Sequence, residues 1–154
     1  MTAHEKKLVA THEAAHAVVA NFFHHKIKKA DLTGIQIEIK SSDGVAPTGQ
    51  TAHEVIITSL AGGIASRRFS GDGVNGDGDD KAYVKYLALR LSEGRENEAA
   101  ALLDWCRHRA TTAVNQNWRQ IEAVAAALLD REKLSGAEIN EILVRECRDM
   151  SHCD

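Results

Sequence analysis

The sequence has 154 residues with 27% charged and 44% hydrophobic side chains, as is usual for globular proteins, and we expect residues 1–154 to form one domain. A net charge of −3 without a long basic run argues against nucleic acid as a partner. No stretch approaches the roughly 20 apolar residues of a membrane span, and no apolar leader is present, so we expect no membrane segment. Three widely spaced cysteines predict reduced thiols and a cytoplasmic protein.

The first predicted element is a helix that runs from the N-terminus to about His24. Thr2 and Glu5 have the spacing of a capping box, in which each side chain bonds the backbone N–H of the other residue. Apolar residues then recur every three or four positions, which is typical of a helix with one buried face. His12 and His16 fall within this apolar stripe. Because residues four apart on a helix lie one above the other, we expect both imidazoles on the same face.

The segment His12-Glu13-Ala14-Ala15-His16 has the spacing of a catalytic zinc site. Two neutral imidazoles can bind one zinc ion and leave a position for water, and Glu13 is close enough to take a proton from that water. The alternative is a pair of core histidines that hydrogen-bond without a metal. Buried imidazoles need partners, because unsatisfied polar groups are costly inside a protein. A zinc ion would satisfy both rings, so the sequence favours the metal site.

A small β element is predicted after the first helix. Residues 35–39 alternate isoleucine with polar residues, which is the period-two pattern of a half-buried strand. Residues 41–44, Ser-Ser-Asp-Gly, predict a turn, and residues 45–50 are expected to form a short second strand. The basic segment 26–29 is interpreted as a solvated turn.

The rest of the chain is predicted to be helical. A capping box at Thr51 and Glu54 opens a helix that ends at about Phe69. The Gly62-Gly63 pair inside it costs about 1 kcal/mol per glycine relative to alanine, which suggests that another backbone, such as that of the first helix, packs closely there. The remaining predicted helices are 80–91, one long helix or two nearly collinear ones over 97–131, and a last helix capped by Ser135 and Glu138.

Four segments of the chain, taken in order, form a specific set. They are the zinc motif within 11–20, the small-residue helix 60–71 with its Ala-Gly pair, the Asp-rich segment 76–80, and residues 121–139 with a leucine-rich turn and a capped last helix. Together they resemble the peptidase domain of the FtsH family of ATP-dependent zinc proteases. The zinc motif alone is shared by many zinc proteases, but the ordered set is specific and spans about residues 8–145.

The resemblance implies a mainly helical zinc peptidase domain with a small, two-strand β element near the active site. It implies that Asp80 is the third zinc ligand beside His12 and His16. Asp79 is the alternative, but the apolar residues that follow fit the family's register better from Asp80. Zinc would lower the pKa of its bound water toward about 7, and Glu13 would act as the general base. The strand through 35–39 would offer its edge to an extended polypeptide substrate.

The sequence also departs from the family. It contains no Gly-x-x-x-x-Gly-Lys-Ser/Thr loop, so we expect either a stand-alone member or part of a longer protein, with a separate ATPase or another chain as a possible partner and with oligomerisation allowed. Ala15 stands where the family usually has glycine. Ser66 and Arg67 stand where it usually has acids, which removes carboxylates that could support a zinc ligand.

The sequence therefore predicts a zinc-dependent metallopeptidase that hydrolyses peptide bonds in unfolded or flexible polypeptides without ATP. The alternative is a catalytically inactive, FtsH-like zinc-binding module that acts in regulation or protein interaction. Glu13 favours the peptidase, because a structural zinc site usually has four protein ligands and no use for a base. The missing ATPase module and the altered acids favour the alternative.

Overall fold

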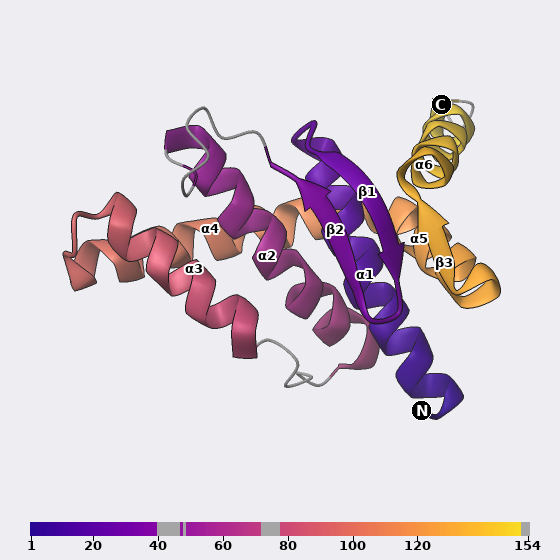
Figure 1. Cartoon of the computed structure of the whole chain (residues 1–154), viewed down its shortest axis with the longest axis horizontal. Coiled ribbons are helices and arrows are strands. Elements are labelled where there is room, and N and C mark those ends of the chain that lie inside the picture. Colours follow the sequence, from indigo (N-terminus) through magenta and orange to yellow (C-terminus); the bar gives the residue numbers. More distant parts are fainter. Residues whose placement is uncertain (40–46, 48, 72–77, 152–154) are drawn as a thin grey trace.

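The computed structural model describes residues 1–39, 47, 49–71 and 78–151, with the side chains of 78–80 and 149–151 outside the description. The elements are α1 (Ala3–Phe22), β1 (Lys26–Asp31), β2 (Gly34–Glu38), α2 (Gly49–Ser70), α3 (Gly78–Leu91), α4 (Glu96–Gln116), α5 (Trp118–Arg131), β3 (Lys133–Ser135) and α6 (Gly136–Ser151). The prediction of a mainly helical fold with a small sheet is confirmed (Figure 1). None of the helices in the described ranges combines the length and hydrophobicity that a membrane crossing requires.

Helix α1 begins at the predicted capping box. The backbone N–H of Thr2 donates to the Glu5 carboxylate at 2.6 Å, and the N–H of Glu5 donates to Thr2 Oγ1 at 3.1 Å. The helix ends at Phe22, and the chain turns at His24, whose φ of +63° lies in the left-handed region. The helix is therefore present as predicted and ends two residues early.

Small residues line the contact between α1 and α2, which is among the most extensive helix contacts in the fold. On α1 the fully buried residues are mostly alanines, and Ala15 is one of them. On α2 the buried residues include Ala61, Gly62, Gly63 and Ala65. Such residues let two helices approach closely, because the distance between helix axes follows the size of the side chains at the contact. The methyl group of Ala15 is accommodated in the core, where it is fully buried.

The larger apolar side chains form the rest of the core. Ile56, Leu87, Ile121, Leu128 and Leu134 are fully buried and come from α2, α3, α5 and β3. Each contributes about 1.5–3 kcal/mol relative to an exposed side chain. Helices α5 and α2 both pack on α1, and α4 packs on α2.

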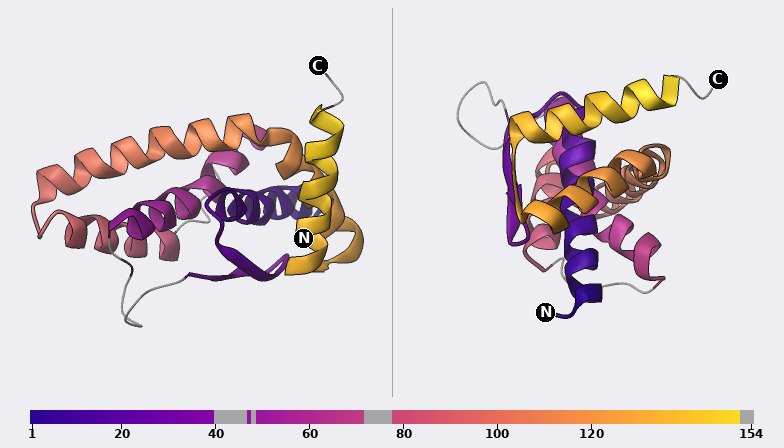
Figure 2. Two further views of the ribbon diagram at one scale, coloured as in Figure 1. Left: turned by 90° about the horizontal axis from the view of Figure 1, so that it is seen from above. Right: turned by 90° about the vertical axis from the view of Figure 1, so that its right-hand side faces the viewer.

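The sheet has three antiparallel strands in the order β2-β1-β3, not the two expected. Figure 1 shows it lying across α1, and the side view in Figure 2 shows it as a layer on one side of the helices. Ile35, Ile37 and Ile39 are half-buried, whereas Gln36 and Glu38 are exposed, as predicted. Because β2 is the outer strand of this sheet, the predicted strand edge is also present.

The interpretation of residues 26–29 as a solvated turn is wrong, because they belong to β1, the central strand. Ile27 pairs with Ile37 and Lys29 with Gln36, so Lys28 is an extra residue in a β-bulge. The bulge places the two buried residues of the strand, Ile27 and Ala30, three positions apart and conceals the period-two pattern. The predicted turn at 41–44 and residues 45, 46 and 48 of the predicted second strand lie outside the described residues. The strand prediction is wrong at residues 49 and 50, which belong to helix α2.

The helix boundaries follow the sequence with small differences. Helix α2 begins at Gly49, so Thr51 lies inside its first turn and is not the N-cap. Helix α3 begins two residues before the predicted start. Residues 97–131 form two helices, α4 and α5, and the chain changes direction at Asn117 between them (Figure 2).

The predicted capping box of the last helix is confirmed. The N–H of Glu138 donates to Ser135 Oγ, and the N–H of Ser135 donates to the Glu138 carboxylate, both at 3.1 Å. The bond from the Ser135 backbone, with help from the Arg131 side chain, holds the pKa of Glu138 below its usual value.

Candidate metal centre

The two histidines of the sequence motif lie on the face of α1 that packs against α2. Their Nε2 atoms are 3.1 Å apart, and the ring planes are inclined by 81°. His16 is buried, with 7% of its surface exposed, and His12 is half-buried. The prediction that both imidazoles share one face is therefore confirmed, and their Nε2 atoms point to one place.

Helix α2 holds the opposite nitrogen of each ring. His16 Nδ1 lies 2.8 Å from the backbone carbonyl oxygen of Thr58, and His12 Nδ1 lies 3.2 Å from Ser66 Oγ. A carbonyl can only accept, so Nδ1 of His16 carries the hydrogen. The Ser66 hydroxyl donates to the carbonyl oxygen of Gly62 at 3.0 Å, which leaves its oxygen to accept from Nδ1 of His12. With the Ser66 hydroxyl bonded to Gly62, the network places the hydrogen on Nδ1 of both neutral rings.

This assignment has a consequence for the Nε2 atoms. In two neutral Nδ1–H imidazoles each Nε2 carries a lone pair, and two lone pairs at 3.1 Å repel each other unless a cation lies near both. Two nitrogens at 2.0–2.1 Å from a tetrahedral zinc ion are about 3.3 Å apart, close to the separation found here. The alternative of a hydrogen-bonded histidine pair requires either a protonated ring or a His12 whose hydrogen is on Nε2, in which case the Ser66 hydroxyl donates to His12 Nδ1 and gives up its bond to Gly62. The two Nε2 atoms therefore fit a zinc ion as ligands, both in their chemistry and in their spacing.

Gly62 of α2 lies directly against the two imidazole rings. A Cβ atom added at Gly62 would lie 2.7 Å from His12 Nε2 and would also collide with His16 Nε2. No side chain fits there while both rings keep their positions. The cost of glycine in a helix was interpreted as a close approach of two backbones, but at Gly62 the imidazole rings of α1 are what lie against it.

The other predicted site residues lie on the same two elements or near them. Glu13 follows His12 on α1 and is half-buried. Asp79 and Asp80 lie in the first turn of α3, which packs against α2, but their side chains are outside the described part of the structure. Within the described residues no three His, Cys, Asp or Glu side chains gather as a set of metal ligands. The structure thus brings His12 and His16 together, and Asp80 as the third ligand stays a prediction.

A cavity of about 130 Å³ opens beside His16, between β2 and α2. Its walls are mainly apolar and come from the three isoleucines at 35, 37 and 39 together with Val55. His25 closes one side, with its Nε2 atom 3.1 Å from the Glu54 carboxylate. The outer strand of the sheet and one imidazole of the pair therefore border the same apolar cavity.

Three residues of this centre were not predicted as site residues: Thr58, Gly62 and Ser66. They are spaced by four along α2, as His16 and His12 are along α1. The two helices run so that Thr58 meets His16 and Ser66 meets His12, with Gly62 between them. This matched spacing of four was a signal in the sequence, but it becomes informative only once the pairing of the two helices is known.

The fold is mainly helical with a small antiparallel sheet, and the centre is a pair of histidines on α1 that α2 holds in place. No protein-family model matches the chain. It is similar to the ATP-dependent zinc metalloprotease FtsH of Neorickettsia risticii (strain Illinois). The alignment is 183 residues long with 24% identity, and it covers 93% of this chain and 29% of the relative. The resemblance found in the sequence is thereby confirmed as a distant similarity to one part of FtsH. The chain spans less than a third of that relative's length.

Proposed function

We propose that this domain is a zinc-dependent metallopeptidase that cuts unfolded or flexible polypeptides. The observation that carries the proposal is the pair of Nε2 atoms 3.1 Å apart, each on a ring whose other nitrogen is held by α2. Such outer partners fix the tautomer and orientation of metal-binding histidines. The distant similarity to an FtsH zinc metalloprotease supports the same conclusion.

In this proposal His12, His16 and Asp80 hold the zinc ion. When bound, zinc would supply a Lewis acid that polarises the substrate carbonyl and activates water. Glu13 would accept the proton of the attacking water and pass it to the leaving amine. Three protein ligands leave a coordination position open, as catalytic zinc sites require.

The outer edge of β2 would orient the substrate. An extended polypeptide can add to a sheet edge through backbone hydrogen bonds, and its side chains then alternate between the two faces. The cavity beside His16 would receive an apolar side chain of that polypeptide, because isoleucines and Val55 form its walls. A tightly folded protein exposes such segments only through local opening. For folded substrates we propose a separate ATPase as the partner that supplies unfolding.

The test is hydrolysis of a permanently unfolded protein by the purified chain, with zinc, with a chelator, and with or without ATP. We expect zinc-dependent cleavage that ATP does not change, since the sequence contains no nucleotide-binding loop. Glu13→Gln should keep its zinc and its fold but lose about 10²–10⁴-fold in rate, because an amide cannot accept the water's proton. Normal turnover by zinc-loaded Glu13→Gln would remove Glu13 from the role of base.

The second candidate is a zinc-binding module without peptidase activity, and Ser66 is the observation that favours it. This neutral hydroxyl contacts His12 Nδ1, and a neutral partner raises the basicity of an imidazole ligand less than a carboxylate does. The same experiment separates the two candidates. A wild-type chain that is loaded with zinc and cuts neither unfolded protein nor short peptides would be the inactive module.

A further inference from the structure

A second and larger cavity, of about 240 Å³, lies between α2, α3 and α4. It is smaller than the roughly 300–1,000 Å³ that is usual for small-molecule sites, so it suits a side chain or a short segment better than a whole cofactor. Its lining comes from all three helices and falls into an apolar and a basic group. The apolar residues are Leu60, Ile64, Val84 and Leu103, and the basic residues are Arg67, Lys81, Lys85 and Arg107.

The basic group is unusual in a chain whose net charge is −3. Within the described ranges, Lys81 and Lys85 form no ion pair. Arg107 lies 3.8 Å from Asp104, an exposed neighbour on the same helix, and this is a long contact between solvated groups. Most of the positive charge at this cavity is therefore available to a ligand, and the complementary ligand is an anion with an apolar part.

Ser59 connects this cavity to the candidate metal centre. It lines the 240 Å³ cavity, and it also lines the apolar cavity beside His16. The two cavities thus lie on either side of the same residue of α2. One extended polypeptide that occupies the cavity beside His16 can continue past Ser59 into the 240 Å³ cavity, which we call the basic cavity.

We propose that the basic cavity binds an acidic–apolar segment of the polypeptide substrate, in which an aliphatic or aromatic residue is next to Asp or Glu. The apolar side chain contacts Ile64 and Val84 inside the cavity, and the carboxylate lies among Lys81, Lys85 and Arg107. This proposal rests on the proposed peptidase function, because it takes the ligand to be part of the chain that is cut. It narrows the substrates to polypeptides that carry such a segment a few residues from the cleavage site.

The test uses fluorescent peptides of one length that carry a leucine-glutamate pair at different distances from a common apolar centre. A matched series has leucine-glutamine in the same places. Binding is measured by fluorescence anisotropy on the zinc-loaded Glu13→Gln chain, which does not consume the peptide. At one spacing we expect the acidic peptide to bind about fivefold more tightly than its amide counterpart, the upper range for an exposed ion pair. The preference should fade as salt is raised, because the cations are exposed.

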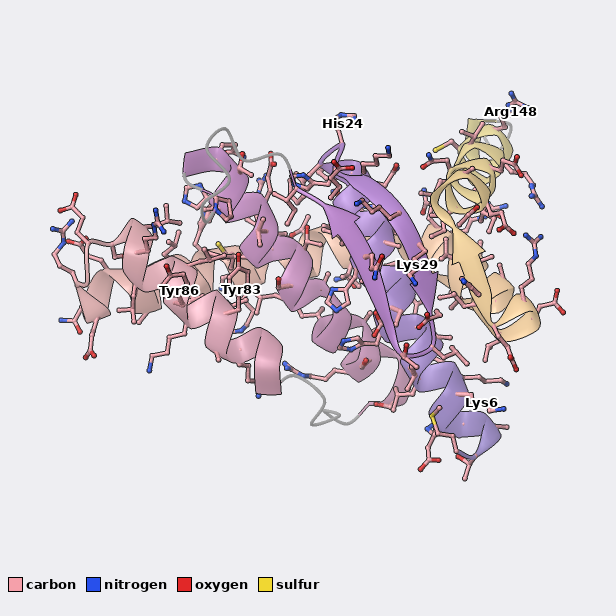
Figure 3. All side chains as sticks on the ribbon, viewed as in Figure 1. Lys6, His24, Lys29, Tyr83, Tyr86 and Arg148 are labelled. Atoms are coloured by element: carbon pink, nitrogen blue, oxygen red, sulfur yellow. The ribbon has the colours of Figure 1, made fainter. Side chains whose placement is uncertain are left out.

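The test variant carries both Lys85→Gln and Arg107→Gln. The control variant is Lys6→Gln. Figure 3 shows Lys6 near the N-terminal end of α1, well away from Tyr83 and Tyr86 on α3. The double variant should lose most of the preference for the acidic peptide, because only Lys81 remains of the three proposed cations, whereas Lys6→Gln should keep the fivefold preference. Circular dichroism of each variant should show the wild-type fold, because all three substitutions are of exposed side chains.

Three outcomes would overturn the inference: equal binding of the two peptides by the Glu13→Gln chain, an undiminished preference in the double variant, or a binding preference that does not appear in kcat/KM of the wild-type chain. The last result would place the acidic segment on a partner and not on the substrate. Failure of the proposed function is read separately, since it is the absence of any zinc-dependent cleavage by the wild-type chain, whichever peptide is offered.

Discussion

Each imidazole of the pair is held by an oxygen of α2 on the side away from its neighbour. For His16 this oxygen is a backbone carbonyl, which no substitution can remove, and for His12 it is the Ser66 hydroxyl. Ser66 is almost completely buried, so water does not readily replace its hydroxyl group. The orientation of His12 therefore depends in part on a side chain that a substitution can remove.

Ser66→Ala should weaken zinc binding about tenfold, because outer partners of metal-binding histidines contribute about 10–100-fold to affinity and this partner is neutral. The measurement is competition with a chelator of known affinity. Ser59→Ala is the control, since Ser59 lies on the same helix and faces the cavities. Equal affinities for the two variants would mean that Ser66 does not support His12.

Gly62→Ala should empty the metal site. Alanine gains about 1 kcal/mol over glycine in a helix, but the added methyl group would collide with both imidazoles, and overpacking costs about 1–3 kcal/mol. The clash therefore outweighs the gain in helix propensity, and the metal-free variant should be slightly less stable than wild type in urea. Elemental analysis should find little zinc. A zinc content equal to that of wild type would show that both rings can move aside without losing the metal.

At the scale of elements, the sequence predicted helix starts that depend only on residues close together in the chain. The capping boxes at Thr2 and Ser135 start helices where expected, because each is complete within four residues. The one predicted at Thr51 does not, because helix α2 already begins at Gly49. Strand β1 was missed for the opposite reason. Its bulge at Lys28 is stabilised by pairing with β2, so the pattern of buried residues in β1 depends on a neighbouring strand.

The residues of the candidate site also divide into those that a local pattern predicts and those that only helix packing brings together. His12, Glu13 and His16 lie on one helix, so their relative positions follow from helix geometry and could be predicted. Ser66 and Gly62 join them only through the packing of α2 on α1, which no local pattern specifies. The sequence analysis noted Ser66 as a departure from the family's acids, and the structure places it against His12.

The start of α3 supports a test of the third ligand. Asp79 and Asp80 are neighbours in the first turn of this helix, where a carboxylate interacts favourably with the helix dipole. Asp80→Asn and Asp79→Asn therefore remove the same charge from the same helix end. We expect Asp80→Asn to lower the zinc content sharply and Asp79→Asn to leave it near wild type, as measured by elemental analysis. The reverse pattern would move the ligand by one residue.

At the scale of the whole molecule, α2 lies between the two helices that carry the proposed ligands. It packs against α1 on one side and against α3 and α4 on the other, whereas α1 and α3 make few direct contacts. A zinc ion held by His12 and His16 of α1 and by Asp80 of α3 would join two helices that are otherwise connected mainly through α2.

Zinc should therefore slow amide hydrogen exchange in the first turns of α3 more than in α6, which packs on β1, β3 and α5. The measurement compares the chain with saturating zinc and with a chelator. The Asp80→Asn variant is the control, since zinc should no longer protect α3 in it. Equal protection of α3 with zinc and with the chelator in the wild-type chain would contradict a ligand from this helix.

The candidate metal centre and the α1–α2 contact are one structure, because Thr58, Gly62 and Ser66 lie against the imidazole rings and belong to that contact. Ligand binding and folding of such a protein are thermodynamically linked. A ligand that binds only the folded state stabilises it by about 2.7 kcal/mol when its free concentration is 100 times Kd. The melting temperature of this chain should then follow the free zinc concentration. A substitution that weakens the site would shift that temperature by an amount that depends on the buffer, and it would do so without removing any apolar contact from the core.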